Sequence, residues 1–271
     1  MKDFPRTLQV ETTTVCPSDC IMCPHRLVVR KKFMDMRLVE KIINECRNRP
    51  VTIIPHQMGD PFADSRMIDI LKKCKEANLR IALSTTAFLL TEDKIRELMK
   101  IEVDQINISI DSLQKNVYEK IRQNLDFNKI MANIMDILKY KIGKTKVLLS
   151  AVNLGFNKGV DKDLKRFCEG KPIDGVQFES YVRFPGVNDK RLPQPRRRNR
   201  QYCYRLDSDM VIMSDARVSK CCIDYNGVDV LGDVNLQTIE DIWNGEKRRD
   251  LVRYIKQHGR KLYPCGICSL G

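Results

Sequence analysis

Three cysteines near the start of the chain, Cys16, Cys20 and Cys23, constrain the fold more than any other feature. Their spacing is Cys-x3-Cys-x2-Cys, directly after a β-like run at 7–13 and directly before Pro24. Thiolates are soft ligands that suit iron–sulfur clusters, zinc or Cu(I). Three thiolates leave one iron of a four-iron cluster open, whereas structural zinc requires a fourth protein ligand. His25 could supply that ligand, so the spacing alone leaves both metals open.

A second group of cysteines stands near the other end of the sequence: Cys203, Cys221, Cys222, Cys265 and Cys268. A terminal C-x2-C pair with further cysteines upstream indicates a four-thiolate metal site. Residues 210–222 predict a β-hairpin that turns at 214–216, which brings Cys203 and Cys221 together. Residues 231–257 predict a turn and an amphipathic helix that lead back to the final pair.

The chain has 271 residues and eleven cysteines, and its start lacks the apolar stretch of a signal peptide. We therefore expect a cytoplasmic protein in which cysteines serve metal or redox chemistry and not a disulfide framework. Cys46, Cys74 and Cys168 lie singly in helix-like segments, where packed thiols are expected. No apolar run approaches the ~20 residues of a membrane helix.

The formal charge of +13 favours anionic partners such as phosphates, nucleotides, nucleic acid or an acidic peptide. It is concentrated in the run PRRRNR at 195–200, within a segment of proline, glycine and charge that predicts a linker. The arginines either steer an anionic partner or are simply solvated. A non-enzymatic zinc or nucleic-acid-binding protein is the rival class, but zinc-finger spacing and base-stacking aromatics are missing, which disfavours nucleic acid.

Between the cysteine groups, strand-like and helix-like segments alternate. Strands are predicted within 7–13, 51–62, 80–90, 104–112, 144–154 and 174–184, and helices within 31–49, 65–77, 91–100, 114–140 and 161–169. Such alternation indicates an α/β fold with a parallel sheet and right-handed crossovers. A doubly wound sheet and a curved partial barrel share this pattern.

The triplet, the strand before it and Pro24 resemble the radical S-adenosylmethionine superfamily. The resemblance implies a (β/α)6 partial TIM barrel and a [4Fe-4S] cluster on Cys16, Cys20 and Cys23. It also implies that the amino and carboxylate groups of S-adenosylmethionine bind the open iron, so His25 is not a ligand. One electron then cleaves the cofactor to a 5′-deoxyadenosyl radical. Met22 stands where the family usually has an aromatic residue near the adenine.

Further cofactor-binding residues follow from the same resemblance, at the carboxyl ends of the strands. The turn Gly59-Asp60-Pro61 is similar to the family's GGEP segment, although Met58 and Asp60 depart from it. The other candidates are Thr85 in the stretch 84–87, Ser109 and Asp111 in a Ser-x-Asp motif, and Ser150, with Asn153 nearby. Asn107 shares the polar face of Ser109 and Asp111, opposite Ile106, Ile108 and Ile110, and a polar face inside a barrel favours a ligand-lined lumen.

The last predicted strand carries Gln177, Glu179, Tyr181 and Arg183 on one face. This face either belongs to a solvent-exposed edge strand or lies at the mouth of the barrel. In the second case Tyr181 and Arg183 hold or deprotonate the substrate, and they are the candidate catalytic residues.

The terminal region resembles the SPASM/Twitch auxiliary-cluster region of many radical S-adenosylmethionine enzymes. The resemblance rests on the order Cys, hairpin, Cys, Leu-Gly-Asp, an Ile-Trp-Asn helix and Cys-x2-Cys. It implies an auxiliary [4Fe-4S] cluster held by Cys203, Cys221, Cys265 and Cys268. Cys222 is then spare, either a catalytic hydrogen-atom donor or a packed thiol. A cluster with four protein ligands suits electron transfer. The expected units are a barrel at 1–184, a basic linker at 185–201 and an auxiliary domain at 202–271.

Among such enzymes the single auxiliary cluster most resembles the 2-deoxy-scyllo-inosamine dehydrogenase type, which oxidises a cyclitol alcohol to a ketone. We therefore expect oxidation of a small polar, sugar-like or phosphorylated substrate, with flavodoxin or ferredoxin as electron donor. The alternative is a maturase or epimerase of a ribosomally made peptide. The barrel begins near residue 5, so a leader-binding domain is not expected before it, although a separate chain could supply one.

Overall fold

The core of the fold is a curved β-sheet, in which the strands of the barrel are neighbours in the order in which they occur in the chain. The structure is a computed structural model that describes residues 4–30, 33–194 and 202–268. In this part of the chain, six parallel strands lie in the order β1-β3-β4-β5-β7-β8. They are β1 (Thr7–Val10), β3 (Thr52–Ile54), β4 (Arg80–Thr85), β5 (Gln105–Ser109), β7 (Lys146–Asn153) and β8 (Gly175–Ser180). The predicted α/β partial barrel is confirmed.

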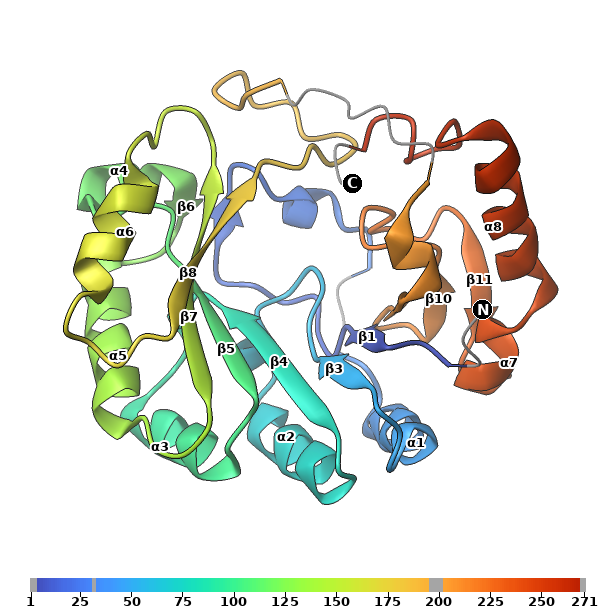
Figure 1. Ribbon diagram of the computed structural model, residues 1–271, viewed down its shortest axis with the longest axis horizontal. Helices are drawn as coiled ribbons and strands as arrows, with labels where there is room; N and C mark the ends of the chain where they lie inside the picture. The colour runs from blue at the N-terminus through green and yellow to red at the C-terminus, as the bar shows by residue number, and fades with distance from the viewer. Residues whose placement is uncertain (1–3, 31–32, 195–201, 269–271) are drawn as a thin grey trace.

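Helices cover the outer face of the curved sheet (Figure 1). They are α1 (Met36–Cys46), α2 (Met67–Glu76), α3 (Glu92–Ile101), α4 (Lys115–Ile121), α5 (Phe127–Tyr140) and α6 (Val160–Cys168). Side-chain oxygens of Asp35, Thr91 and Asp126 cap the first turns of α1, α3 and α5. The apolar sides of strands and helices meet in one core, in which Ile81, Ile106 and Val147 are completely buried. Cys46 and Cys74 belong to this core and Cys168 packs against it, as predicted.

The strands alternate as the sequence predicts. In β5, Ile106 and Ile108 are buried in the core, whereas Gln105, Asn107 and Ser109 lie half-buried on the opposite, inner face. The predicted polar face of this strand is therefore present in the fold.

The segment predicted to contain helix at 114–140 is two helices, because the short strand β6 (Arg122–Gln123) separates α4 from α5. β6 pairs antiparallel with β2 (Asp19–Cys20), which lies within the cysteine triplet. The helix is thus interrupted where its backbone bonds to the cysteine loop.

Strand β8 lies at the free edge of the sheet and ends at Ser180. Phe178, Glu179 and Ser180 are exposed there. Tyr181 and Arg183 follow the strand and do not continue it, so the predicted period-two face does not extend to them.

The terminal region extends the same sheet. Strand β9 (Asp209–Ile212) pairs parallel with β1, and β10 (Arg217–Ser219) and β11 (Val230–Asp233) follow antiparallel. The predicted hairpin turn at 214–216 is confirmed. Helices α7 (Ile239–Trp243) and α8 (Glu246–His258) complete this region. The pairing of β9 with β1 was not predicted, and the boundaries at 184 and 202 stay a prediction. The basic run at 195–200 lies outside the described residues.

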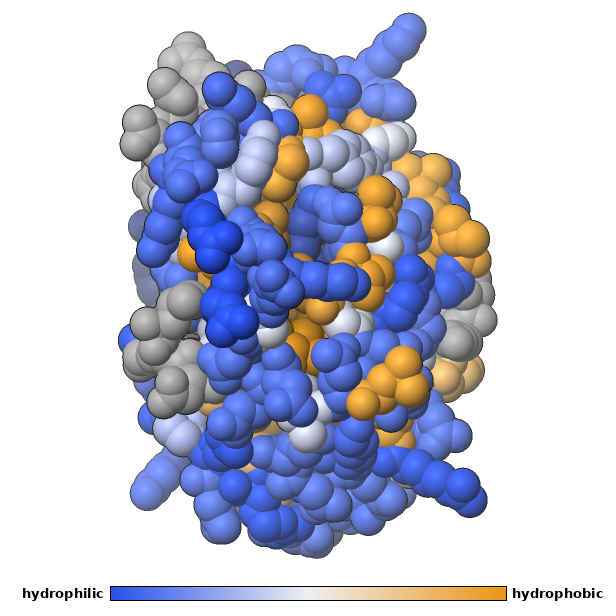
Figure 2. Space-filling model, turned by 90° about the vertical axis from the view of Figure 1, so that its right-hand side faces the viewer, coloured by the Kyte–Doolittle hydropathy of each residue, from blue (hydrophilic) through white to orange (hydrophobic). Residues whose placement is uncertain are grey.

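Among the residues that the structure describes, no helix combines the length and apolar character needed to cross a membrane. Figure 2 shows the side of the molecule that lies to the right in Figure 1, where apolar side chains are scattered among hydrophilic ones.

Candidate functional site

The cysteine triplet lies in a loop that follows β1 and is clamped against α4 and β6. Cys20 pairs with Arg122 across the β2–β6 ladder, and Ile21 N donates to Ile121 O at 3.0 Å. The Ser18 hydroxyl lies 3.0 Å from Cys20 Sγ, and Cys23 N donates to Cys20 O at 3.1 Å. These bonds fix the relative positions of the cysteines.

The three thiols lie close enough for their charges to interact. Burial raises the pKa of Cys16 and of Cys23 to about 12, with further contributions from neighbouring cysteines. Backbone N–H groups of Ser18 and His25 donate to the sulfurs of Cys16 and Cys23 respectively. Such N–H donation stabilises a thiolate, the form that binds metal. Burial thus favours the protonated thiol at Cys16 and Cys23 without metal, and the N–H donors prepare both sulfurs to become ligands.

The donor set of the triplet suits a four-iron cluster. Three thiolates would each bind one iron and leave the fourth iron open. His25 Nε2 lies 2.8 Å from Thr14 O and is thus engaged with the backbone.

A buried ion pair stands beside the triplet. Arg122 Nε donates to Asp111 Oδ2 at 2.7 Å, and Arg122 Nη1 lies 3.7 Å from Cys20 Sγ. The Asp111 carboxylate also accepts from Val152 N at 2.7 Å and is fully buried. Asp111, predicted as a cofactor ligand, therefore uses both carboxylate oxygens inside the protein. It positions Arg122, whose charge faces the cysteines.

The turn Gly59-Asp60-Pro61 packs directly on the triplet loop. Asp60 N donates to Val15 O at 3.0 Å. A Cβ at Gly59 would lie 2.3 Å from Thr13 O and 2.8 Å from Val15 O, so only glycine fits this approach. The turn thus adjoins the first cysteine, as its predicted cofactor role requires.

The Asp60 side chain holds the next strand end in place. It accepts from the Thr85 hydroxyl at 3.0 Å, from the Thr86 hydroxyl at 2.9 Å and from Thr86 N at 3.0 Å. Thr85 is therefore committed to Asp60 and Ala87 N, and its direct contact with a cofactor stays a prediction.

Polar residues of β5 and β7 line the inner face beyond this turn. Asn107 Nδ2 lies 3.5 Å from Ser84 Oγ, and Ser150 Oγ donates to Ile108 O at 3.4 Å. Ser109 lies on the same face. Asn153 is the last residue of β7 and is exposed, and its side-chain oxygen accepts from Gly155 N at 3.0 Å in the turn that follows.

Met22 and Tyr181 share one apolar cluster with Ile21 and Ile121. Both side chains are buried, and burial raises the pKa of Tyr181. The structure therefore brings Tyr181 to the triplet from the far end of the barrel sequence. Arg183 instead contacts Gln194 Oε1 at 3.1 Å in the segment that follows β8.

The second group of cysteines surrounds one cavity. Cys203, Cys221, Cys222, Cys265 and Cys268 all line it, together with Leu206, Leu251 and Ile255. η3 (Tyr204–Asp207), the loop after β10 and the loop after α8 bring these cysteines together. The predicted meeting of Cys203 and Cys221 is confirmed. A closed set of thiols with apolar walls fits a four-iron cluster.

Cys221 and Cys222 differ in their surroundings. The backbone N–H groups of Asp224 and Ile223 donate to Cys221, the pattern also found at Cys16 and Cys23. Burial raises the pKa of Cys222 to about 11. The positive charge of Arg205 lowers this pKa and has the largest effect of the neighbouring charges. Cys221 is therefore better prepared to be a ligand.

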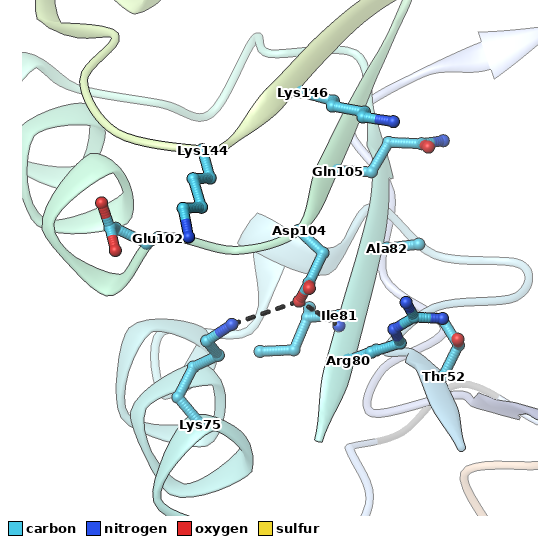
Figure 3. A pocket seen from close by; sticks show the side chains of 10 residues that line it. All are labelled: Thr52, Lys75, Arg80, Ile81, Ala82, Glu102, Asp104, Gln105, Lys144 and Lys146. Atoms are coloured by element: carbon cyan, nitrogen blue, oxygen red, sulfur yellow. Dashed lines mark hydrogen bonds and ion pairs between the residues drawn. The ribbon is translucent and has the colours of Figure 1, made fainter. Parts of the chain in front are cut away.

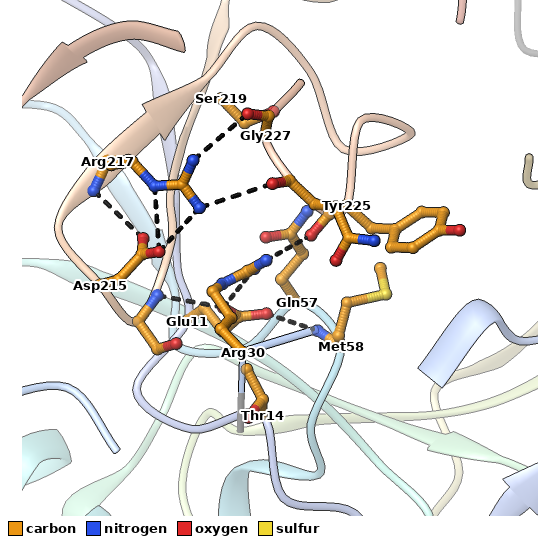
Figure 4. A network of polar contacts seen from close by, with 12 residues as sticks. Glu11, Thr14, Arg30, Gln57, Met58, Asp215, Arg217, Ser219, Tyr225 and Gly227 are labelled. Carbon is orange, nitrogen blue, oxygen red and sulfur yellow. Dashed lines mark hydrogen bonds and ion pairs between the residues drawn. The ribbon is translucent and has the colours of Figure 1, made fainter. Parts of the chain in front are cut away.

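A buried network links the triplet loop, the 58–61 turn and the auxiliary region (Figure 4). The Glu11 carboxylate accepts from Arg30 Nη2 at 2.6 Å, from Ser214 N at 3.0 Å and from Met58 N at 3.3 Å. Arg30 Nη1 donates to Tyr225 O at 2.6 Å. Gln57 Nε2 lies 3.4 Å from Cys222 O. The two cysteine sites therefore belong to one bonded arrangement.

Sequence reasoning missed Glu11, Arg30 and Arg122. Glu11 directly follows β1, where a charged residue is usually exposed, so nothing in the local sequence marks it as buried. Arg30 and Arg122 lie in segments rich in basic residues, where neither stands out.

A separate cavity of about 440 Å³ opens at the amino-terminal ends of β4, β5 and β7 (Figure 3). Lys75, Arg80, Lys144 and Lys146 line it, and Lys75 Nζ lies 3.2 Å from Asp104 Oδ2. The triplet follows the carboxyl end of β1, so this basic cavity lies at the opposite end of the strands.

Comparison with known proteins extends these observations. The chain is 30% identical to an uncharacterized protein of Methanocaldococcus jannaschii over 48% of its own length and 43% of the relative's. It is 24% identical to the GTP 3′,8-cyclase of Clostridium perfringens over 62% of its length and 53% of the cyclase. The chain thus spans about half the length of these curated relatives.

Solved structures share the fold. BtrN in complex with AdoMet and 2-DOIA is 16% identical, with a TM-score of 0.69 over 99% of this chain and 94% of BtrN. Streptococcus suis SuiB bound to S-adenosylmethionine is 16% identical, with a TM-score of 0.76 over 98% of this chain and 71% of SuiB. At such identities the likeness concerns the fold alone.

Two family patterns cover most of the sequence. An iron–sulfur cluster-binding domain, SPASM, matches residues 203–269, which contain the second group of cysteines. The Radical SAM superfamily matches residues 10–168, which contain the triplet, the 58–61 turn and Asp111. The cofactors are accordingly S-adenosylmethionine and two [4Fe-4S] clusters, and the described thiols fit both. The chain belongs to the Radical SAM superfamily.

Proposed function

We propose that this chain is an oxidoreductase that abstracts a hydrogen atom from a small polar, sugar-like or phosphorylated substrate and completes its oxidation through the auxiliary site. The observation that carries the proposal is the presence of two unlike thiol sites in one bonded arrangement. One site offers three cysteines, and the other offers a cavity lined by five. Three thiolates leave a position for a cofactor, whereas four protein ligands suit electron transfer.

The chain's own residues organise the first site. When bound there, S-adenosylmethionine and the reduced cluster supply a 5′-deoxyadenosyl radical. Cys16, Cys20 and Cys23 would hold the cluster, and the backbone of the 58–61 turn would bind the cofactor's amino group. Arg122, held by Asp111, places positive charge on the same side as the cysteines. A carboxylate or a cluster of net negative charge is stabilised there.

The inner face of the barrel provides polar contacts for the cofactor and the substrate. Ser109 and Ser150 are the proposed hydroxyl donors, with Thr85 contributing through the Asp60 network. Met22 and Tyr181 form the apolar wall next to the triplet. Tyr181 is the proposed contact to the substrate, and Arg183 is proposed to hold an anionic group at the mouth.

The substrate class rests on charge and on the relatives. The net charge of +13 favours an anion. The curated relatives include an enzyme that acts on GTP by its name, and BtrN was solved with 2-DOIA. A reducing donor such as flavodoxin or ferredoxin supplies the electron for cofactor cleavage. The proposed units are a barrel at 1–184, a basic linker at 185–201 and an auxiliary domain at 202–271.

A peptide maturase or epimerase is the second candidate. SuiB was solved with its precursor peptide SuiA and shares this fold over 98% of the present chain with a TM-score of 0.75. Cys222 supports the epimerase form of this candidate, because a spare thiol near the auxiliary site could return a hydrogen atom to a substrate radical.

The test is anaerobic turnover with S-adenosylmethionine, reductant and candidate substrates of both classes. Transfer of deuterium from labelled substrate into 5′-deoxyadenosine identifies the molecule that loses hydrogen. The proposal requires a carbonyl product two hydrogens lighter than a polar small substrate. Deuterium transfer from a peptide only, with a crosslinked or epimerised product, would replace the first candidate by the second.

A further inference from the structure

Three basic side chains line the cavity of the auxiliary cysteines: Arg205, Lys220 and Arg260. No carboxylate is among the described residues that line it. The remaining wall is apolar, from Leu206, Ile223, Leu251, Ile255 and Pro264. Three cationic side chains thus surround five thiols, and acids outside the lining pair with two of them, Asp209 with Arg205 and Asp229 with Lys220.

Two of these cations are held firmly from outside the cavity. Lys220 is 4% exposed, and its Nζ pairs with Asp229 and donates to Tyr263 O. Arg260 is 6% exposed and donates from Nη2 to Cys268 O at 2.9 Å. Each therefore stays at the cavity wall, and Arg260 is bonded to the backbone of a proposed ligand.

Arg205 differs because part of its guanidinium is unsatisfied. Nη1 donates to Asp209 Oδ2 at 3.0 Å, whereas Nε is buried and makes no hydrogen bond within the described part of the chain. A buried N–H without an acceptor costs about 1–3 kcal/mol. An acceptor within the cavity, such as a thiolate or sulfide sulfur, would remove this cost.

The physical consequence concerns electron affinity. A cluster with four thiolate ligands carries net negative charge, which increases by one when it is reduced. Nearby cations and N–H donors to sulfur stabilise the more negative state, so they raise the reduction potential. The effect is strong where the surroundings are apolar, since charges are screened less there.

We propose that Arg205, Lys220 and Arg260 raise the reduction potential of the auxiliary cluster that these cysteines would hold, with Arg205 Nε donating to a cluster sulfur. This inference rests on the proposed function. On that function, a substrate radical that has lost a hydrogen atom to the 5′-deoxyadenosyl radical would give one electron to the oxidised auxiliary cluster and its hydroxyl proton to solvent, which would leave a carbonyl group. A higher reduction potential of the cluster would favour that electron transfer.

The test is a redox titration followed by electron paramagnetic resonance. It uses the full chain with Cys16, Cys20 and Cys23 replaced by alanine, so that only the auxiliary cluster contributes. Arg205→Met removes charge and donor, and Arg205→Lys keeps the charge without Nε. Arg253→Met is the matched control, because Arg253 is on α8, exposed and paired with Asp250. We expect a lower midpoint potential for Arg205→Met, a smaller decrease for Arg205→Lys and no change for Arg253→Met.

An unchanged midpoint potential in Arg205→Met would overturn the inference. If that variant fails to hold its cluster, Arg205→Gln decides in the same way, since it removes the charge and keeps a polar side chain. The titration uses no substrate, so its result is independent of turnover. Failure to form 5′-deoxyadenosine in the native chain would instead count against the proposed function and leave the measured potentials valid.

Discussion

Arg30 Nη2 donates to Glu11 Oε2 at 2.6 Å, and the two side chains are 9% and 0% exposed. The pair lies where the triplet loop, the 58–61 turn and the auxiliary region meet. Glu11 binds the backbone of Met58 and Ser214, and Arg30 binds the backbone of Tyr225. One ion pair therefore holds both cluster-binding regions in a fixed relation.

Replacing Arg30 by methionine is expected to destabilise the protein by about 3–5 kcal/mol, because it leaves the Glu11 carboxylate buried without its cation. Chemical unfolding measures the difference. The control is Glu240→Gln, which removes the exposed Arg49–Glu240 pair, also between the barrel and the auxiliary region, and should cost less than about 1 kcal/mol. Equal effects of the two substitutions would show that the buried pair has no special role.

Gly59→Ala is expected to abolish cofactor cleavage and reduce iron in the first site. The new Cβ would lie 2.3 Å from Thr13 O, so the loop before Cys16 must move. Gly175→Ala is the matched control, since its Cβ would meet only Leu148 Cδ2 at 3.4 Å. Iron content and 5′-deoxyadenosine formation measure the outcome. Native values for both in Gly59→Ala would disprove the close packing of the turn.

His56 predicts a pH dependence of stability. Burial lowers the pKa of His56 to about 4 from 6.5, and its Nε2 accepts from Ser84 N at 3.0 Å. The folded state therefore favours the neutral ring. The stabilisation of the folded state by the neutral ring is complete above about pH 6.5 and decreases as the pH falls towards 4. The free energy of unfolding falls by less than about 3 kcal/mol over this range, because the His56 side chain is only half-buried and solvent weakens the effect.

The measurement compares the free energy of unfolding of the native protein and His56→Gln between pH 4 and 7. The difference between the two should shrink or reverse at low pH, since glutamine does not titrate. Parallel curves would mean that His56 does not titrate on unfolding.

Cys221→Ala is expected to lose the iron of the auxiliary site, about four atoms per chain, because Cys221 receives two backbone N–H groups. Cys222→Ala should retain it. Full turnover in Cys222→Ala would also exclude a role as hydrogen-atom donor. The reverse pattern of iron loss would make Cys222 the ligand.

Much of the architecture was predictable from the sequence. The six parallel strands follow from alternating apolar residues such as Ile106 and Ile108, and the hairpin follows from its turn at 214–216. Local patterns of this kind need no knowledge of distant neighbours. The triplet spacing likewise predicted a soft-metal site, and the resemblance to the superfamily predicted that it holds a cluster.

The buried polar contacts of the candidate site could not be predicted, because they join residues far apart in the sequence and leave no local pattern. Ser214 reaches Glu11 only because β9 docks on β1, and Arg122 reaches Cys20 only because β6 interrupts a helix. Asp111 was predicted to bind the cofactor, whereas its ion pair with Arg122 could not be predicted, because no sequence pattern relates these two residues. Tyr181 was expected on a strand, but it reaches Met22 from the loop after β8.

The most direct test of the central claim is anaerobic reconstitution followed by metal analysis and incubation with S-adenosylmethionine and reductant. The native chain should bind about eight iron and eight sulfide and form 5′-deoxyadenosine. The variant that lacks the thiols of Cys16, Cys20 and Cys23 should keep about four iron and form none. Zinc without iron or labile sulfide, or no 5′-deoxyadenosine from the fully loaded native chain, would contradict the account.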